Sequence, residues 1–301
     1  MRPFDFLRRK NRQLDEMSER VRSLEATVEH LREALGRIES RQSAGQPTPS
    51  LREHEFKVFS QWGEDGIIDH LIRHVAIPRP FFVEFGVETY REANTRFLLT
   101  QQAWHGLIME GSEKDVAAIR RDPICWKHHL SVVHAFITKE NINDLLKTNG
   151  AAGPIGLLSI DVDGNDYWIW EAITVSQPAI VVMEYNALFG PDRAVTVPYN
   201  PEFRRDTAHW SQVYVGASLR ALVRLGHRKG YAFVGTNRAG NNAFFVESSR
   251  LPAGWRDLTV EEGFTPPQFR EARNEKGQLG YFPAEEAAKL IANLPLVEVP
   301  E

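Results

Sequence analysis

Acidic side chains stand at the ends of several short apolar runs in this 301-residue chain. Runs with the composition of buried strands end at or near five acids: Glu84, Glu110, Asp161, Asp163 and Glu184. His134 and Phe136 close a further run, and Asn186 follows the last acid. The carboxyl ends of parallel strands share one edge of a sheet, where open α/β folds bind their ligands. The recurrence predicts one polar, mainly acidic site at that edge.

Three of these residues carry oxygen ligands of the kind that hard divalent cations prefer. Asp161 ends the fourth run, while Glu184 and Asn186 end the fifth, and the tips of neighbouring strands lie close together. The set predicts a site for Mg²⁺ or Mn²⁺, where a bound acceptor hydroxyl would have a lowered pKa. Asp163 or Asp166 could take the place of Asp161, which could instead be a turn residue or a cofactor contact.

An acceptor hydroxyl also needs a group that takes its proton. Asp163, His134 and His209 are the candidate general bases, because carboxylate and imidazole groups commonly act as proton acceptors. For each histidine a surface or packing role is the plainer interpretation, and we favour it. Segment 204–219 mixes polar and aromatic side chains, which fits either a cap over the acceptor pocket or an ordinary connection.

The residues at the first two strand ends indicate which ligand the edge would bind. Glu110 suits a ribose, because a carboxylate can accept hydrogen bonds from two adjacent hydroxyls. The first turn, from Glu84 through Gly86 to Glu88, lacks the G-x-G-x-x-G pattern of phosphate-binding turns. Its two acids would repel a pyrophosphate but attract the sulfonium and ammonium groups of S-adenosylmethionine. The turn therefore favours an adenosyl ligand without phosphates over NAD.

The elements that position these residues alternate between strands and helices from residue 56 onward. Expected strands lie at 81–87, 106–111, 130–137, 156–164 and 179–186, each leading into a helical stretch. A helix is expected over 219–230 and a hairpin over 231–246. Apolar strands separated by helices indicate an α/β fold with a parallel sheet, here with a reversed edge formed by the hairpin. We expect the domain to span 56–250, with 251–301 as a C-terminal appendage packed on it.

Several motifs of this domain resemble those of FkbM-related class I S-adenosylmethionine-dependent methyltransferases. They are SQWGEDGI (60–67), FFVEFGV (81–87), Asn94-Thr95, LIMEG (107–111), LLSIDVDGNDYWIW (157–170), VVMEYN (181–186) and NAFFV (242–246). Glu88 stands where the class has a second glycine. The resemblance implies a Rossmann-like, seven-stranded methyltransferase sheet with an antiparallel last strand. It also implies O-methylation of a sugar or glycan hydroxyl.

The resemblance extends to the expected ligand contacts. The implied S-adenosylmethionine contacts are Gln61, Glu84, Gly86, Thr95, Glu110, Phe136 and Asp161. The acids after the fourth and fifth strands also resemble the magnesium site of catechol-type O-methyltransferases, although Glu184 and Asn186 are separated here by one residue.

The first part of the chain has a different pattern. Apolar residues repeat at alternating spacings of three and four: Leu14, Met17, Val21, Leu24, Val28, Leu31, Leu35 and Ile38. This heptad pattern predicts an N-terminal α-helical coiled coil within residues 1–42, followed by a linker over 43–55. Valine at two a positions and leucine at two d positions favour a parallel homodimer, and a trimer stays open. The alternative is one amphipathic helix docked on its own domain.

The basic segment 1–12 and the overall composition bear on location and partners. This segment could contact an anionic membrane surface, although a solvated helix start is the interpretation we favour. With no apolar run of spanning length and one cysteine, Cys125, we expect a cytoplasmic protein, with the inner membrane face left open. The net charge of −4 argues against a nucleic-acid partner.

Two other functions compete with methyl transfer. The glycine-poor first turn and the heptads would also fit a catalytically degenerate methyltransferase fold that acts as an oligomeric scaffold. The string Asp161-Val-Asp163-Gly-Asn165 is close to the motif of haloacid-dehalogenase-like phosphatases, but it follows the fourth strand instead of the first.

Overall fold

The computed structural model describes the chain except residues 1–2, 46–47, 49 and 269–270, and except the side chains of residues 3–9. The predicted membrane contact of the basic N-terminus therefore falls largely on side chains outside the described residues. Among the described helices, none is long and apolar enough to cross a lipid bilayer.

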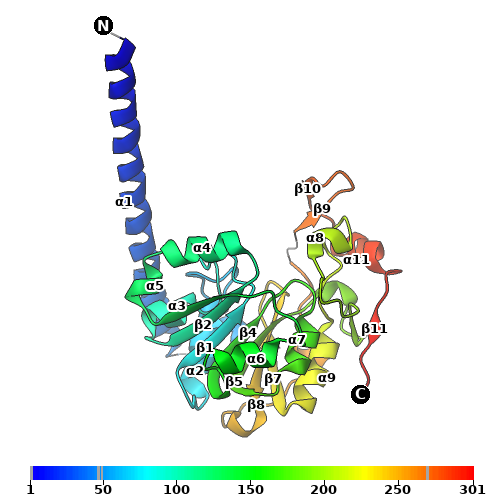
Figure 1. Ribbon diagram of the computed structural model, residues 1–301. Helices are drawn as coiled ribbons and strands as arrows, with labels where there is room; N and C mark the ends of the chain where they lie inside the picture. The colour runs from blue at the N-terminus through cyan, green and yellow to red at the C-terminus, as the bar shows by residue number, and fades with distance from the viewer. Residues whose placement is uncertain (1–2, 46–47, 49, 269–270) are drawn as a thin grey trace.

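A seven-stranded sheet forms the centre of the body (Figure 1). Its strands are β1 (Phe81–Phe85), β2 (His105–Glu110), β3 (Leu130–His134), β4 (Gly153–Ile160), β5 (Ser176–Glu184), β7 (Tyr231–Thr236) and β8 (Asn242–Glu247). The order across the sheet is β3-β2-β1-β4-β5-β8-β7. The pairs among β1 to β5 are parallel, whereas β8 runs antiparallel to both β5 and β7. The predicted Rossmann-like, seven-stranded sheet with an antiparallel last strand is confirmed.

The structure shows which strand of the hairpin joins the parallel part of the sheet. The hairpin forms the edge of the sheet as predicted, with the reversed strand β8 inside and β7 outermost. The hairpin pattern cannot tell which of its two strands joins the parallel part. In the structure the register sets Asn242 opposite Glu184, so the start of β8 lies beside the end of β5.

Helices cover both faces of the sheet, which explains why its central strands are mainly apolar. On one face, Phe82 and Leu157 pack against α2 (Glu64–His74) and α3 (Arg96–Gln101), with α4 (Glu113–Arg121) and α5 (Ile124–Lys127) beside β2 and β3. On the other face, Val83 and Leu158 belong to the core formed with α6 (Ile142–Thr148), α7 (Asp166–Ala172) and α9 (Leu219–Arg228). Successive residues of a strand point to opposite faces, so two-sided burial requires a continuous apolar run.

The chain after β8 folds along one side of the body. It contains η3 (Ser248–Arg250), α10 (Val260–Gly263), β9 (Ala272–Arg273), β10 (Leu279–Gly280), α11 (Ala284–Ile291) and β11 (Val297–Glu298). Strand β11 pairs with β6 (Val195–Thr196), and α11 contacts η2 (Ala187–Phe189). Close by, α8 (Arg205–Ala208) precedes α9.

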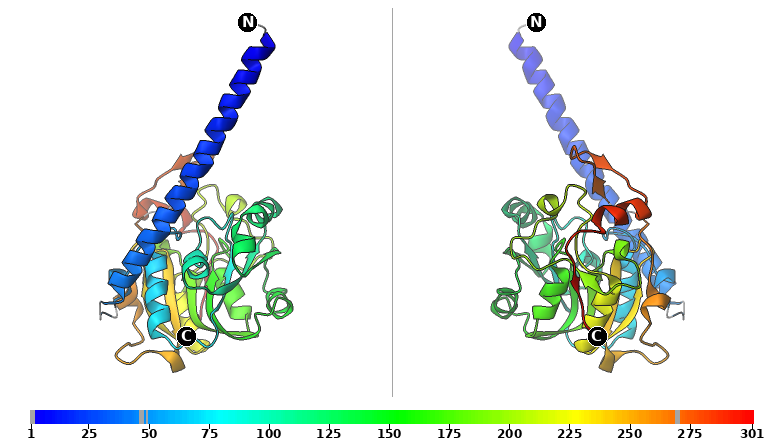
Figure 2. Two further views of the ribbon diagram at one scale, coloured as in Figure 1. Left: turned by 90° about the vertical axis from the view of Figure 1, so that its left-hand side faces the viewer. Right: turned by 90° about the vertical axis from the view of Figure 1, so that its right-hand side faces the viewer.

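The predicted N-terminal helix is confirmed as α1 (Pro3–Ser43), which rises far beyond the body (Figures 1 and 2). Only its C-terminal part packs on the domain, against α2, α3 and the segment 54–58 that follows η1 (Leu51–Glu53). A Cβ on Gly36 would lie 2.4 Å from Cγ2 of Val58, so glycine permits this close approach. Ser40 Oγ donates to Asp69 of α2 at 2.9 Å.

Aromatic rings stack where α1 ends against the body. Ser43 Oγ lies 2.6 Å from Nδ1 of His54, whose ring stacks on buried His70 with centroids 3.5 Å apart. Trp255 stacks on the same His70 ring at 5.3 Å. Within the described residues neither nitrogen of His70 has a hydrogen-bond partner. Burial, followed by the charges of His54, His74 and Arg73, lowers the pKa of His70 to about 3.

This histidine should make folding sensitive to acid. The pKa of His70 lies below its ordinary value of 6.5, so the unfolded chain binds the extra proton between pH 6.5 and about 3. The neutral His70 ring therefore contributes fully to the stability of the fold above pH 6.5, and this contribution is lost as the pH falls from 6.5 towards 3. Urea unfolding at pH 7 and pH 5 should show that His70→Phe removes roughly 1 to 2 kcal/mol of the acid destabilisation. The exposed His105→Gln control should leave it unchanged, and equal acid sensitivity in His70→Phe and wild type would contradict the assignment.

Candidate functional site

A cavity of about 380 Å³ opens at the carboxyl ends of β1, β2, β4 and β5. The sequence-predicted residues that line it are Gln61, Glu84, Gly86, Glu110, Phe136, Asp161, Asp163 and Glu184. Four other predicted residues, Thr95, His134, Asn186 and His209, are described but do not belong to the lining. The predicted acidic edge therefore exists, with a smaller set of residues than expected.

The floor of the cavity is a contact between two backbone turns, one after β1 and one after β4. Gly86 has φ of +69°, and a Cβ built on it would lie 1.6 Å from the carbonyl oxygen of Asp161. Any other residue at this position would force the two turns apart. Glycine is thus required by the approach of β1 to β4 as well as by the left-handed backbone.

Glu84 lies at this floor and is held by the segment that leads into α3. Its carboxylate accepts hydrogen bonds from the backbone N–H groups of Asn94 at 2.8 Å and Thr95 at 3.1 Å, and from Thr95 Oγ1. Burial nevertheless raises the pKa of Glu84 to about 7. Thr95, predicted as a cofactor contact, is fully buried and orients Glu84 instead of lining the cavity.

Glu110, at the end of β2, is fixed by backbone donors on both sides. Oε2 accepts from the N–H of Glu88 at 2.9 Å, and Oε1 accepts from the N–H of Ser112 at 2.8 Å. A carboxylate has about four lone-pair sites, so each oxygen keeps one for a ligand. The half-exposed ring of Phe136 lies next to Gly111, where a Cβ would be 3.3 Å from the ring.

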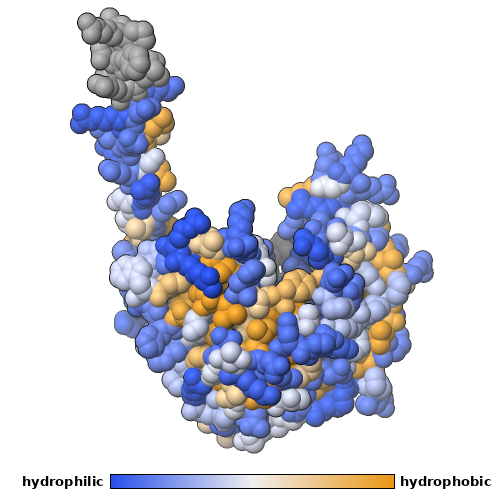
Figure 3. Space-filling model, viewed as in Figure 1, coloured by the Kyte–Doolittle hydropathy of each residue, from blue (hydrophilic) through white to orange (hydrophobic). Residues whose placement is uncertain are grey.

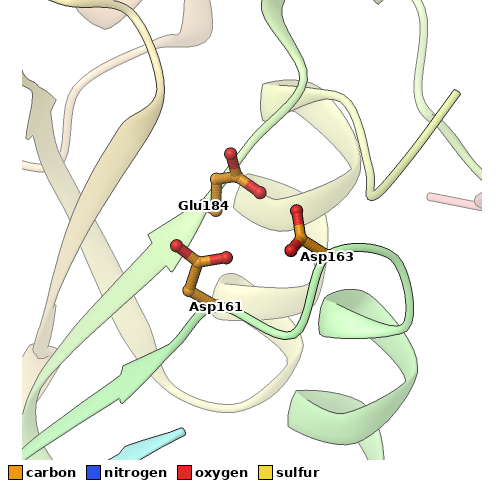
Figure 4. Close-up of side chains that lie close together, drawn as sticks. All are labelled: Asp161, Asp163 and Glu184. Atoms are coloured by element: carbon orange, nitrogen blue, oxygen red, sulfur yellow. The ribbon is translucent and has the colours of Figure 1, made fainter. Parts of the chain in front are cut away.

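Three carboxylates gather on the other side of the cavity (Figure 4). Asp161 and Asp163 come from the turn after β4 and Glu184 from the end of β5, and each offers an oxygen within 4.8 Å of the others. Burial, followed by the charges of Glu184, Asp163 and Asp166, raises the pKa of Asp161 well above its ordinary value. Like charges this close require a proton or a cation between them. Their hard oxygen atoms fit Mg²⁺ or Mn²⁺.

Arg205 of α8 is the cationic residue in this cavity that the sequence-based prediction missed. Its Nη1 donates to Asp163 Oδ1 at 3.0 Å, while Nε donates to the carbonyl oxygen of Gln212 at 2.8 Å. Burial opposes the charge on Arg205, but Asp163 and Glu184 outweigh it and raise the pKa of the guanidinium. One signal in the sequence points to it, since Arg205 lies in segment 204–219, whose polar and aromatic side chains fit a cap over the acceptor pocket.

The structure corrects the predicted role of Asn186. Its side-chain nitrogen donates to the carbonyl oxygens of Val213 and Val215 at 2.9 and 3.0 Å, and its oxygen accepts from the N–H of Leu188 at 3.2 Å. These bonds occupy the amide in joining β5 to the segment before α9, so we leave Asn186 out of the ligand set. Asp163 takes its place beside Asp161 and Glu184.

The structure also corrects the predicted role of the two histidines as general bases. His134 is exposed at the end of β3, with Nε2 3.1 Å from the carbonyl oxygen of Gly111. His209 holds Ser211 Oγ at 2.7 Å through Nδ1, and burial lowers its pKa.

Asp166 is buried and caps its own turn by accepting from the N–H groups of Val162 and Gly164. Like His134 and His209, it does not line the cavity.

No protein-family model and no curated protein sequence matches this chain. Among solved structures, the N-terminal domain of EvdMO1 with SAH bound is 11% identical, covering 70% of this chain and 94% of that chain with a TM-score of 0.40. An S-adenosylmethionine-dependent methyltransferase from Clostridium acetobutylicum is 8% identical, over 61% and 89% of the two chains, with a TM-score of 0.37. An O-methyltransferase from Bacillus cereus in complex with SAH is 12% identical, over 55% and 72%, with a TM-score of 0.34. These similarities are too distant to assign an activity, and the fold follows from the order and direction of the strands.

Proposed function

We propose that this chain is an S-adenosylmethionine-dependent O-methyltransferase that uses a divalent cation and acts on a hydroxyl of a sugar or glycan. The observation that carries the proposal is the cavity at the strand ends. It joins a fixed carboxylate on β2, Glu110, to a three-carboxylate cluster on β4 and β5. The motif resemblance to FkbM-related methyltransferases supports the same class.

The cofactor would occupy the β1–β2 side of the cavity. The free lone pairs of Glu110 suit the ribose hydroxyls, and the exposed face of Phe136 suits stacking on adenine. Burial raises the pKa of both Glu84 and Glu88. The charges of neighbouring acids, Asp163 first, raise that of Glu88 further, so negative charge is in excess beside Glu88. A sulfonium and an ammonium group would reduce this excess, whereas a pyrophosphate would increase it.

The acceptor and the cation would occupy the β4–β5 side. Asp161, Asp163 and Glu184 are the proposed ligands of a divalent ion, which when bound lowers the pKa of an acceptor hydroxyl. Asn242 and Glu271 also line the cavity, and their side-chain oxygens can accept hydrogen bonds from a polyhydroxylated acceptor. Arg205 holds Oδ1 of half-exposed Asp163, so Oδ2 is the oxygen that Asp163 offers to the cation. Where Asp161 and Glu184 alone hold the cation, the same oxygen can instead take the acceptor proton.

The two alternatives from the sequence have less support. A scaffold with a degenerate fold would be expected to fill its acceptor pocket with side chains, but the volume here lies within the range of ligand sites. A phosphatase would need Asp161 after the first core strand, whereas it follows β4.

Cofactor binding provides the first test. We expect calorimetry to detect binding of S-adenosylhomocysteine, and Glu110→Gln to weaken it by about tenfold or more, because a charge-assisted hydrogen bond to ribose is lost. Glu113→Gln is the matched control, since Glu113 is exposed on α4 outside the cavity. Absence of binding by the wild-type chain at millimolar ligand would refute the methyltransferase proposal.

The metal assignment has its own test. Titration with Mn²⁺ should show a site that is weakened by about tenfold or more in Asp161→Asn, because the ion loses one of its three carboxylate charges. The same variant should still bind S-adenosylhomocysteine, and the exposed Asp192→Asn control should retain the Mn²⁺ site. Methyl transfer that continues unchanged in EDTA would remove the cation from the proposal and leave the cofactor assignment intact.

Arg205 should compete with the cation. Its guanidinium donates a hydrogen bond to Asp163, one of the proposed ligands, and adds positive charge to the cluster. Arg205→Met is therefore expected to tighten Mn²⁺ binding by about tenfold. The neighbouring Arg204 pairs with Asp206 at the surface, which makes Arg204→Met the matched control. Weaker Mn²⁺ binding in Arg205→Met would instead mean that Arg205 orients Asp163 for the ion.

A further inference from the structure

The heptad residues of α1 form an apolar stripe that the domain leaves uncovered. Its members are Leu14, Met17, Val21, Leu24, Val28, Leu31, Leu35 and Ile38, and each side chain is 50 to 64% exposed. Apolar residues along the projecting helix are visible in Figure 3. A continuous stripe of eight large apolar side chains is unusual on a surface that faces only water.

The domain contacts α1 through a different face of the helix. Arg96 donates to Glu29 at 2.7 Å, Arg37 donates to Gln101 at 2.8 Å, and Gly36 lies against Val58. With Val21 and Val28 at heptad position a, Gly36 takes position b, which points about 130° from the middle of the a/d stripe. Docking on the body and pairing through the stripe therefore do not compete for the same side of α1.

Most of α1 also lies beyond the body, where no part of the domain could cover it (Figures 1 and 2). Helices in proteins gain most of their stability from packing of an amphipathic face, and a lone helix in water is marginal. The projecting part has such a face and no described tertiary contact along it. A second helix would supply the missing packing without meeting the domain.

The residues of the stripe and its flanks fit a second copy of this chain. Valine at a with leucine at d, as at Val21 and Leu24, favours two parallel strands. In that arrangement Arg20 of one copy lies beside Glu25 of the other, and symmetry repeats the pair. The next two flanking pairs, Thr27 with Arg32 and Ala34 with Glu39, bring no like charges together.

We propose that α1 forms a two-stranded parallel coiled coil with a second copy of this chain, holding the two domains on its outer sides. Burying roughly 100 Å² of each stripe side chain on both copies would remove about 1,600 Å² from water, the size of a standard stable interface. The proposal is independent of the methyltransferase assignment, because no residue of the stripe lines the cavity.

Light scattering of the full-length chain tests the stoichiometry. We expect twice the monomer mass of 34.3 kDa at micromolar concentration. The double substitution V21E/L24E should give the monomer mass, because it buries four carboxylates in the seam. The matched control S23E/A26E adds the same charge at the same spacing on exposed non-stripe positions and should stay dimeric. Circular dichroism and S-adenosylhomocysteine binding monitor the fold of each variant.

A cysteine placed near the start of the stripe tests the orientation. Cys125 is the only native cysteine, so Leu14→Cys in a Cys125→Ser background leaves one thiol at position 14. Oxidation should link two chains, since residue 14 meets its own copy in a parallel pair but lies far from it in an antiparallel one. A monomeric or trimeric wild-type mass, or a dimer without this cross-link, would overturn the proposal.

Discussion

The close approach of two backbone turns brings the two sides of the cavity together. Gly86 and the carbonyl group of Asp161 touch without room for a methyl group, which brings the turns after β1 and β4 together. From that contact Glu84 lies on one side of the cavity and Asp161 on the other. Neighbouring parallel strands alone would not bring these groups so near, because the turns could otherwise splay outward.

The turn after β4 concentrates negative charge, and the repulsion between its carboxylates is unfavourable. The carboxylate of Asp166 accepts hydrogen bonds from the N–H groups of Val162 and Gly164, which fixes the turn. Asp161 and Asp163 are left facing Glu184. Asp163 adopts a left-handed φ of 54°, a conformation that aspartate tolerates better than most residues. Arg205 neutralises part of this charge from α8, a segment more than forty residues away in sequence. The site is thus a balance between a local turn and a distant cation.

Much of the fold could be predicted because strands buried on both faces must be apolar throughout, and these runs identified β1 to β5. The site residues directly at strand ends, such as Glu110 and Asp161, were predictable for the same reason, since the strand fixes where its last residue lies. Arg205 and the amide bonds of Asn186 could not be predicted in this way. Their positions depend on how the long connections between β5 and α9 fold back on the sheet, which no periodicity in the sequence encodes.

The direction in which α1 leaves the body limits what can reach the cavity. The helix has 41 residues, about 60 Å of rigid rod, and it rises on the side where the strands end (Figure 1). A broad flat surface that approaches that side therefore meets the tip of the helix long before it meets Glu110 or Glu184. For the proposed acceptor, this geometry favours a molecule that is free in solution or carried on a flexible arm over one fixed in a broad surface.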